Sequence, residues 1–155
     1  PNKEGKLSEA DIRSLRGFRQ LYANTFTDNL LAKAKVTCAL SEGKGRNVID
    51  DNYDTSVRPK MKDGKAVFSF KLNKPATFNV LSVQEDIRKG QRVEKFSLEV
   101  KDAKGNWKKV TGGTTVGHKR LLKFPVETAK EVRLIISEVR AVPAISEIGL
   151  YRLRD

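Results

Sequence analysis

The stretches QEDIRKGQRVEKFSLEV (residues 84–100) and VRLIISEVRAVPAISEIGLY (residues 132–151) decide the fold of this chain. In the first, every second residue from Phe96 to Val100 is apolar, and the second begins with the same alternation. An apolar residue at every second position is typical of a strand with one buried face. Both stretches therefore predict half-buried β-strands, each joined to a polar loop.

The same alternation continues along most of the chain, interrupted by turn signals. Asp63-Gly64 and residues 102–106 are typical of hairpin turns. Pro75, Pro125 and Pro143 are expected between strands, where a missing amide donor costs least. Short strands at this spacing, without helices between them, indicate a sandwich or barrel. The strands are predicted at residues 36–39, 66–72, 78–85, 93–101, 107–111, 119–124, 131–137 and 145–152.

Residues 8–26 (SEADIRSLRGFRQLYANTF) predict one amphipathic helix ahead of the strands. Ser8 is expected as the N-cap, and Asp11 completes a variant of the capping box. Apolar residues recur every three or four positions from Ile12 to Phe26, as on one face of a helix. A single helix that leads into β-structure is expected to connect to an upstream domain.

The composition fits one domain with one core. The chain has 155 residues and a formal net charge of +12, but Lys and Arg are spread along it without a nucleic-acid-binding motif, which favours a solvated basic surface. No apolar run approaches the about 18 residues of a membrane helix. The first residue is Pro1 rather than Met, which indicates a fragment whose targeting signals lie outside the sequence.

Residues 47–55 (NVIDDNYDT) are the strongest chemical candidate. They place three carboxylates and two Asn within nine residues of a basic protein. Clustered acids repel one another unless they are solvated or neutralised, and hard oxygen ligands at short loop spacing suit Ca²⁺. A polar Asx-rich loop without an ion is the alternative interpretation.

Other candidates are weaker. Trp107, just after a hairpin turn, is expected to pack on the sheet rather than to stack on a sugar. Basic loop residues form a possible glycan or docking surface, since guanidinium groups hydrogen-bond sugar hydroxyls or carboxylates. Ion pairs that tie the loops together through Glu85 and Asp86 are the favoured alternative. The residues of this possible surface are Arg88, Arg92, His118, Arg120 and Arg140.

Three segments closely resemble the C-terminal domain of bacterial and plant α-L-fucosidases, which are retaining glycoside hydrolases. They are residues 84–96 (QEDIRKGQRVEKF), 113–120 (GTTVGHKR) and 144–151 (AISEIGLY). Residues 5–12 (GKLSEADI) resemble the linker that leaves the catalytic barrel, and Pro1-Asn2 resemble the end of the preceding loop. The resemblance implies an all-β fold, a discoidin-like (factor V/VIII type C) jelly-roll sandwich over 34–155, similar to galactose-binding carbohydrate modules. Residues 1–33 would form the linker and the helix.

In that family the catalytic carboxylates lie in the upstream barrel, which this sequence does not contain. The resemblance therefore implies a non-catalytic accessory domain that packs on the barrel and contacts glycan. An independent module for galactose- or fucose-containing glycans is the main alternative. A basic binder of nucleic acid or anionic polysaccharide is the less favoured one. The parent protein is expected to be periplasmic or secreted by a bacterium.

The resemblance also implies a structural calcium ion, because discoidin-like modules often hold one in a loop of this form. The implied ligands are Asn47, Asp50, Asn52, Thr55, Ser146 and Glu147. Two residues depart from the family pattern. Asp51 stands where related modules usually have Gly, and Val57 stands where many have Trp.

Overall fold

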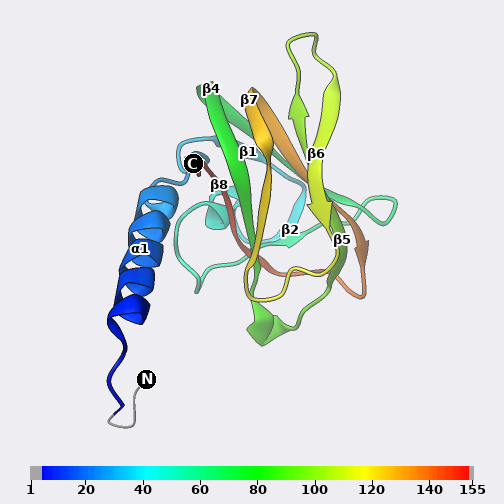
Figure 1. Ribbon diagram of the computed structural model, residues 1–155. Coiled ribbons are helices and arrows are strands. Elements are labelled where there is room, and N and C mark those ends of the chain that lie inside the picture. Colours follow the sequence, from blue (N-terminus) through cyan, green and yellow to red (C-terminus); the bar gives the residue numbers. More distant parts are fainter. Residues whose placement is uncertain (1–4, 154–155) are drawn as a thin grey trace.

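The structure, a computed structural model, describes residues 5–153, so Pro1 and Asn2 lie outside the described residues. One helix precedes the strands (Figure 1). Two short 3₁₀ helices, at Gly45–Val48 and Ile87–Lys89, lie in the loops. The main elements are α1 (Glu9–Phe26), β1 (Lys35–Thr37), β2 (Leu40–Glu42), β3 (Arg58–Pro59), β4 (Ala66–Glu85), β5 (Val93–Lys101), β6 (Trp107–Gly113), β7 (Arg120–Val139) and β8 (Ile145–Tyr151).

Strands β4 and β7 run antiparallel through both layers of a sandwich. The first part of β4 pairs with β1 and with the last part of β7, giving a layer in the order β1-β4-β7-β5-β6. The second part of β4 pairs with the start of β7 and with β8. The register breaks between Lys71 and Ala76 and again between Phe78 and Val80. Bulges of this kind let one strand bend from one layer into the other.

The prediction of separate strands at 66–72 and 78–85, and at 119–124 and 131–137, was wrong, because each pair is one continuous strand. Pro75 and Pro125 accordingly lie inside β4 and β7 rather than between strands. Both fall in stretches where the register breaks, so neither has to donate a ladder hydrogen bond. Pro143 lies between β7 and β8, as predicted.

Alternating side chains of the larger layer point into the core. Phe68, Phe70, Phe96, Leu134 and Ile136 are all 2% exposed or less, while their neighbours along each strand lie on the outer face. The predicted hairpin turn at Asp63-Gly64 is present, and both residues have positive φ, as a type I′ turn requires. The prediction of a β-sandwich preceded by one helix is confirmed.

Helix α1 begins as predicted. The Ser8 hydroxyl accepts a hydrogen bond from the Asp11 amide at 3.1 Å, and the Asp11 carboxylate accepts one from the Ser8 amide at 3.3 Å. The helix stands beside the sandwich (Figure 1), and Thr25 is its buried residue. At its end, the Phe26 ring meets Tyr151 of β8 edge-on, with 4.9 Å between centroids.

Among the described residues, no helix is long and apolar enough to span a membrane.

Candidate calcium site and the neighbouring pocket

The loop between β2 and β3 lies against β8 at one end of the sandwich. Its 3₁₀ helix contacts β8, and the Asp51 amide donates to Glu147 Oε2 at 3.2 Å. Asp51 has a φ of 55°, in the left-handed region that Asp tolerates better than most residues. A positive φ is the conformation that would favour the Gly expected at this position from the family resemblance. Asp51 therefore keeps the backbone turn and adds a carboxylate beside Glu147.

Oxygen atoms crowd around the Thr55 hydroxyl. Thr55 Oγ1 lies 2.9 and 3.1 Å from the two Asp50 carboxylate oxygens, 3.0 Å from the Asn52 carbonyl and 3.4 Å from the Asn47 carbonyl. A hydroxyl has one proton to donate, so only one of these contacts is a full hydrogen bond. The others bring acceptor oxygens together, which is the arrangement that a Ca²⁺ ion with six to eight oxygen ligands requires.

Glu147 of β8 brings a further carboxylate to this loop and is 3% exposed. Burial raises the pKa of its side chain to about 8, and the nearby charges of Asp50 and Asp51 also raise it, against the hydrogen bond from the Asp51 amide. A divalent cation beside Glu147 would reverse this shift, because it stabilises the charged carboxylate. The chemistry of the donor set thus fits calcium.

Ser146 completes the predicted ligand set. The register between β4 and β8 shifts between Gln84 and Glu85, so that Ser146 has no cross-strand partner in the ladder. This bulge takes Ser146 out of the ladder pairing, which suits the predicted role of its backbone carbonyl as a ligand. Among the described residues there is no group of three or more His, Cys, Asp and Glu side chains placed to hold a metal. A calcium ion would therefore depend on two carboxylates supplemented by carbonyl and hydroxyl oxygens.

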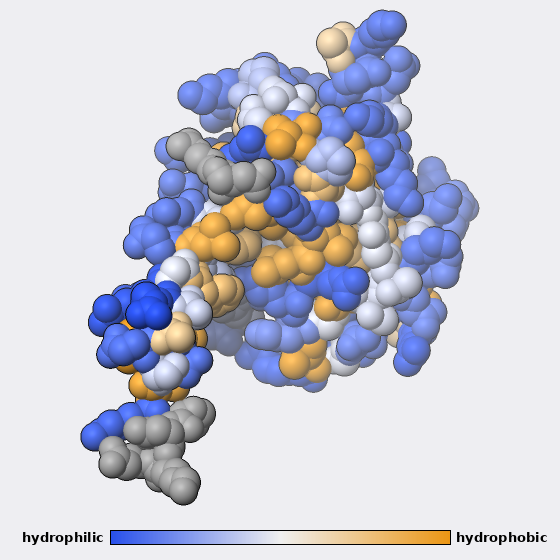
Figure 2. Space-filling model, in the orientation of Figure 1, coloured by the Kyte–Doolittle hydropathy of each residue, from blue (hydrophilic) through white to orange (hydrophobic). Residues whose placement is uncertain are grey.

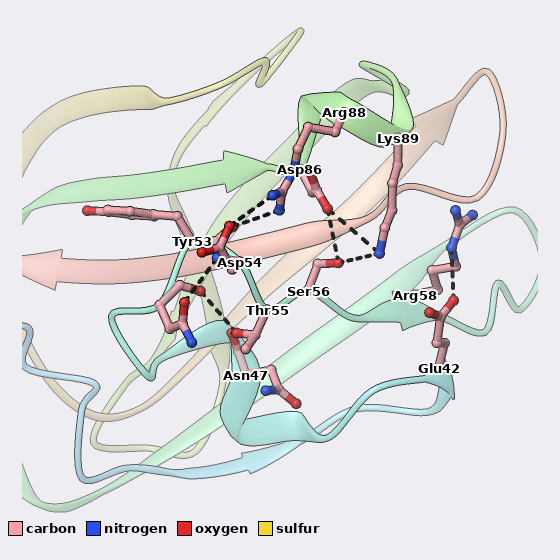
Figure 3. A network of polar contacts seen from close by, with 11 residues as sticks. Glu42, Asn47, Tyr53, Asp54, Thr55, Ser56, Arg58, Asp86, Arg88 and Lys89 are labelled. Carbon is pink, nitrogen blue, oxygen red and sulfur yellow. Dashed lines mark hydrogen bonds and ion pairs between the residues drawn. The ribbon is translucent and has the colours of Figure 1, made fainter.

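A pocket of about 230 Å³ lies beside the loop, bordered by Tyr53, Ile87, Arg88 and His118. Arg88 links two sides of this pocket, because its guanidinium group contacts Asp86 at 2.7 Å and Asp54 at 2.8 Å (Figure 3). The hydrogen bond from Arg88 holds the pKa of Asp86 below its usual range, with help from the charge of the same guanidinium. Arg88 is thus engaged in joining two loops, which was the favoured interpretation from the sequence.

The five residues of the predicted glycan or docking surface do not share one pocket. Only Arg88 and His118 border the pocket just described. Arg92 donates to the Val142 carbonyl at 2.8 Å, and Arg140 pairs with Glu94 at 2.7 Å. Arg120 lies at the start of β7, opposite Val83.

Glu85, at the end of β4, was expected to join the loops through an ion pair, but its carboxylate binds backbone amides instead. It is 1% exposed, and its carboxylate accepts hydrogen bonds from the amides of Arg92, Val93 and Gly117 at 2.9 to 3.1 Å. These contacts fasten two loops to the sandwich. The signal in the sequence is weak, since it consists of a Glu at the last position of a strand.

Comparison with known proteins places the fold in a family. The F5/8 type C domain profile matches residues 32–148, and the chain belongs to this family. Its relatives are α-L-fucosidases. It is 35% identical to α-L-fucosidase 1 of Arabidopsis thaliana over 159 aligned residues, which cover 97% of this chain and 31% of that protein.

Two solved structures agree with this placement. SpGH29 superimposes with a TM-score of 0.91 at 29% identity, over 100% of this chain and 34% of that one. A Ruminococcus gnavus GH29 fucosidase in complex with fucose gives 0.82 at 30% identity, over 100% of this chain and 32% of that one. The chain therefore spans about a third of the length of these relatives and corresponds to their F5/8 type C domain.

The raised pKa of Glu147 predicts a pH-dependent stability in the presence of a chelator. The folded chain holds this proton more tightly than the unfolded chain, whose carboxyl titrates near 4.5. Its stabilising contribution is complete below pH 4.5 and is lost as the pH rises through about 8. Urea unfolding across this range should show the decline in wild type and a flatter curve in Glu147→Gln. Glu138→Gln, on an exposed ion pair, should follow wild type. Parallel curves for wild type and Glu147→Gln would contradict the assignment.

Proposed function

We propose that this chain is a non-catalytic accessory domain of an α-L-fucosidase-like glycoside hydrolase and that α1 packs it against the catalytic barrel. The relatives support this reading, because nearly all of this chain aligns with about a third of each. The observation that carries the docking proposal is the exposed apolar face of α1. Fucoside hydrolysis, by the retaining mechanism of the resembled family, would belong to the remaining two thirds.

Leu15, Phe18 and Tyr22 lie three and four residues apart and so share one face of the helix. They are 54%, 65% and 45% exposed in this chain. Phe18 and Tyr22 contact each other at 6.3 Å between ring centroids, and Tyr22 contacts Phe26 at 4.9 Å. Figure 2 shows apolar residues on the helix and on the face of the sandwich beside it.

This ladder of side chains continues onto β8 through the Phe26–Tyr151 contact. Aromatic residues are the common anchors of protein interfaces, and covering apolar surface contributes about 25 cal/mol per Å². A domain packed over this face would bury Leu15 and Phe18 and would hold α1 at a fixed angle to the sandwich.

A calcium ion is the second part of the proposal. Asn47, Asp50, Asn52 and Thr55 would hold it from the loop, with Glu147 and the Ser146 carbonyl from β8. When bound, the ion would supply positive charge that offsets the repulsion among these oxygens. The ion would then add to the hydrogen bonds that already join the loop to β8, which are the Asp51–Glu147 bond and the backbone pair between Val57 and Ile145. The role is structural, and binding of carbohydrate by the chain alone stays a prediction, as does a periplasmic or secreted location.

Calcium should raise the melting temperature of the wild-type chain relative to the chelated protein. At a concentration about 100 times the dissociation constant, the stabilisation would be about 2.7 kcal/mol. The gain should be larger at pH 8 than at pH 6, because below a pKa of about 8 the ion has to displace the Glu147 proton. Asp50→Asn should abolish the gain, and Asp54→Asn, an acid of the same loop that pairs with Arg88 instead, should retain it. Equal gains in the two variants would refute the ligand set.

The docking proposal predicts a difference between the isolated chain and the full-length parent. In the isolated chain, Leu15→Ser combined with Phe18→Ser should leave the urea midpoint almost unchanged, because both side chains are exposed. In the parent, the same pair should make α1 sensitive to limited proteolysis. Arg13→Ser with Arg16→Ser, on the opposite face of the helix, is the matched control.

Hydrolysis of an aryl fucoside should be absent from the isolated chain and present in the parent. Turnover by the isolated chain would refute the assignment of catalysis to the missing part. If α1 resisted proteolysis equally in all variants of the parent, only the docking role would be refuted. A failure of the docking role can therefore be distinguished from a failure of the assignment of catalysis.

A further inference from the structure

The outer face of the larger layer carries a row of side chains that crosses all five of its strands. Lys35 of β1 is directly opposite Lys71 of β4, which in turn is opposite Glu131 of β7. Lys101 of β5 pairs with Glu131 at 3.1 Å and lies opposite Trp107 of β6. The row thus reads lysine, lysine, glutamate, lysine, tryptophan across the sheet.

Among the described residues, the two lysines at the start of the row form no ion pair, although Lys71 lies opposite Glu131. Glu131 is engaged by Lys101. Directly opposed residues on neighbouring strands have Cβ atoms about 5 Å apart, and like charges in such a pair are destabilising. An anion placed between the two ammonium groups would remove this repulsion.

Trp107 is held at the other end of the row. The Arg133 guanidinium lies 4.3 Å from the centroid of its ring, and Arg133 is itself fixed by an ion pair with Glu99 at 2.6 Å. The indole reaches back over β5 and forms one wall of a shallow pocket of about 290 Å³. The polar part of the lining comprises Lys35, Thr37, Ser69, Lys71 and Glu131.

We propose that this outer-face pocket binds an anionic saccharide, a pyranose ring that carries a carboxylate or a sulfate group. The flat indole suits the apolar C–H face of a sugar ring, because stacking buries apolar area on both. Lys35 and Lys71 present two point charges to the acidic group. The hydroxyls of Thr37 and Ser69, which are opposite each other in the register, hydrogen-bond the ring hydroxyls.

The pocket fits a short saccharide better than a nucleic acid. Single-stranded nucleic acids are held by a basic groove that follows the backbone and by several aromatic residues on which successive bases stack. The lining of this pocket holds one indole and, apart from Phe70 of the core, no second aromatic ring. The proposal rests on the outer sheet face alone and is independent of the calcium loop and of docking through α1.

The test is a calorimetric titration of the chain, at low ionic strength, with trigalacturonate, with a sulfated heparin tetrasaccharide and with neutral galactotriose. Binding of at least one acidic probe and no binding of galactotriose are expected. Trp107→Ala, and separately Lys35→Gln with Lys71→Gln, should weaken acidic-probe binding by about tenfold or more, which corresponds to about 1.4 kcal/mol. Trp107→Phe keeps an aromatic wall and should bind with an intermediate affinity, which tests the site should Trp107→Ala fail to fold.

Lys62→Gln with Lys65→Gln is the matched control. These lysines also oppose each other, across the Asp63-Gly64 turn, but they do not border the pocket. The control should bind within about twofold of wild type. Equal losses in the two lysine pairs would show attraction to net charge alone and would overturn the proposal. It would also be overturned by equal affinity for galactotriose or by no binding of either acidic probe.

Discussion

The rest of the structure depends on the pairing of β4 with β7. Each strand passes from one layer into the other, so the two layers share their central pair of strands. The bend occurs where Pro75 and Pro125 interrupt the ladder and the register shifts. Because the second part of β4 then runs between β7 and β8, it delivers Glu85 and Glu147 to the same end of the sandwich. The acidic loop and the pocket beside it are assembled at that end.

Buried charge distinguishes this end of the molecule from the others. Glu85 is satisfied by three backbone amides and Asp86 by Arg88 and Lys89, so both carboxylates have strong compensation. Glu147 has weaker partners, and its pKa is raised first by burial and then by the charges of Asp50 and Asp51. An uncompensated carboxylate next to crowded oxygens is costly in a stable fold, and a bound cation would remove that cost.

Elements with strong local signals were predicted well from the sequence. Ser8 and Asp11 define the start of α1, and the alternation from Phe96 to Val100 defines β5, because both patterns act within a few residues. The prolines misled the interpretation of β4 and β7, since a bulge tolerates Pro and leaves no mark in composition. The candidate calcium ligands of the loop could be grouped because they are close in sequence.

The long-range features could not be predicted in this way. The three amides around Glu85 and the row from Lys35 to Trp107 depend on registers between strands distant in the sequence. The exposure of Leu15 and Phe18 could not be predicted either. An amphipathic pattern predicts that one face of a helix is buried, but it does not identify the surface that covers this face.

The central claim is that α1 presents a surface to a catalytic domain outside this chain. Hydrogen exchange measured on the isolated chain and on the full-length parent tests it most directly. The account predicts that amides of Leu15 to Tyr22 exchange rapidly in the isolated chain and slowly in the parent, while those of β4 and β7 are protected equally in both. Equal exchange of α1 in the two proteins would contradict it.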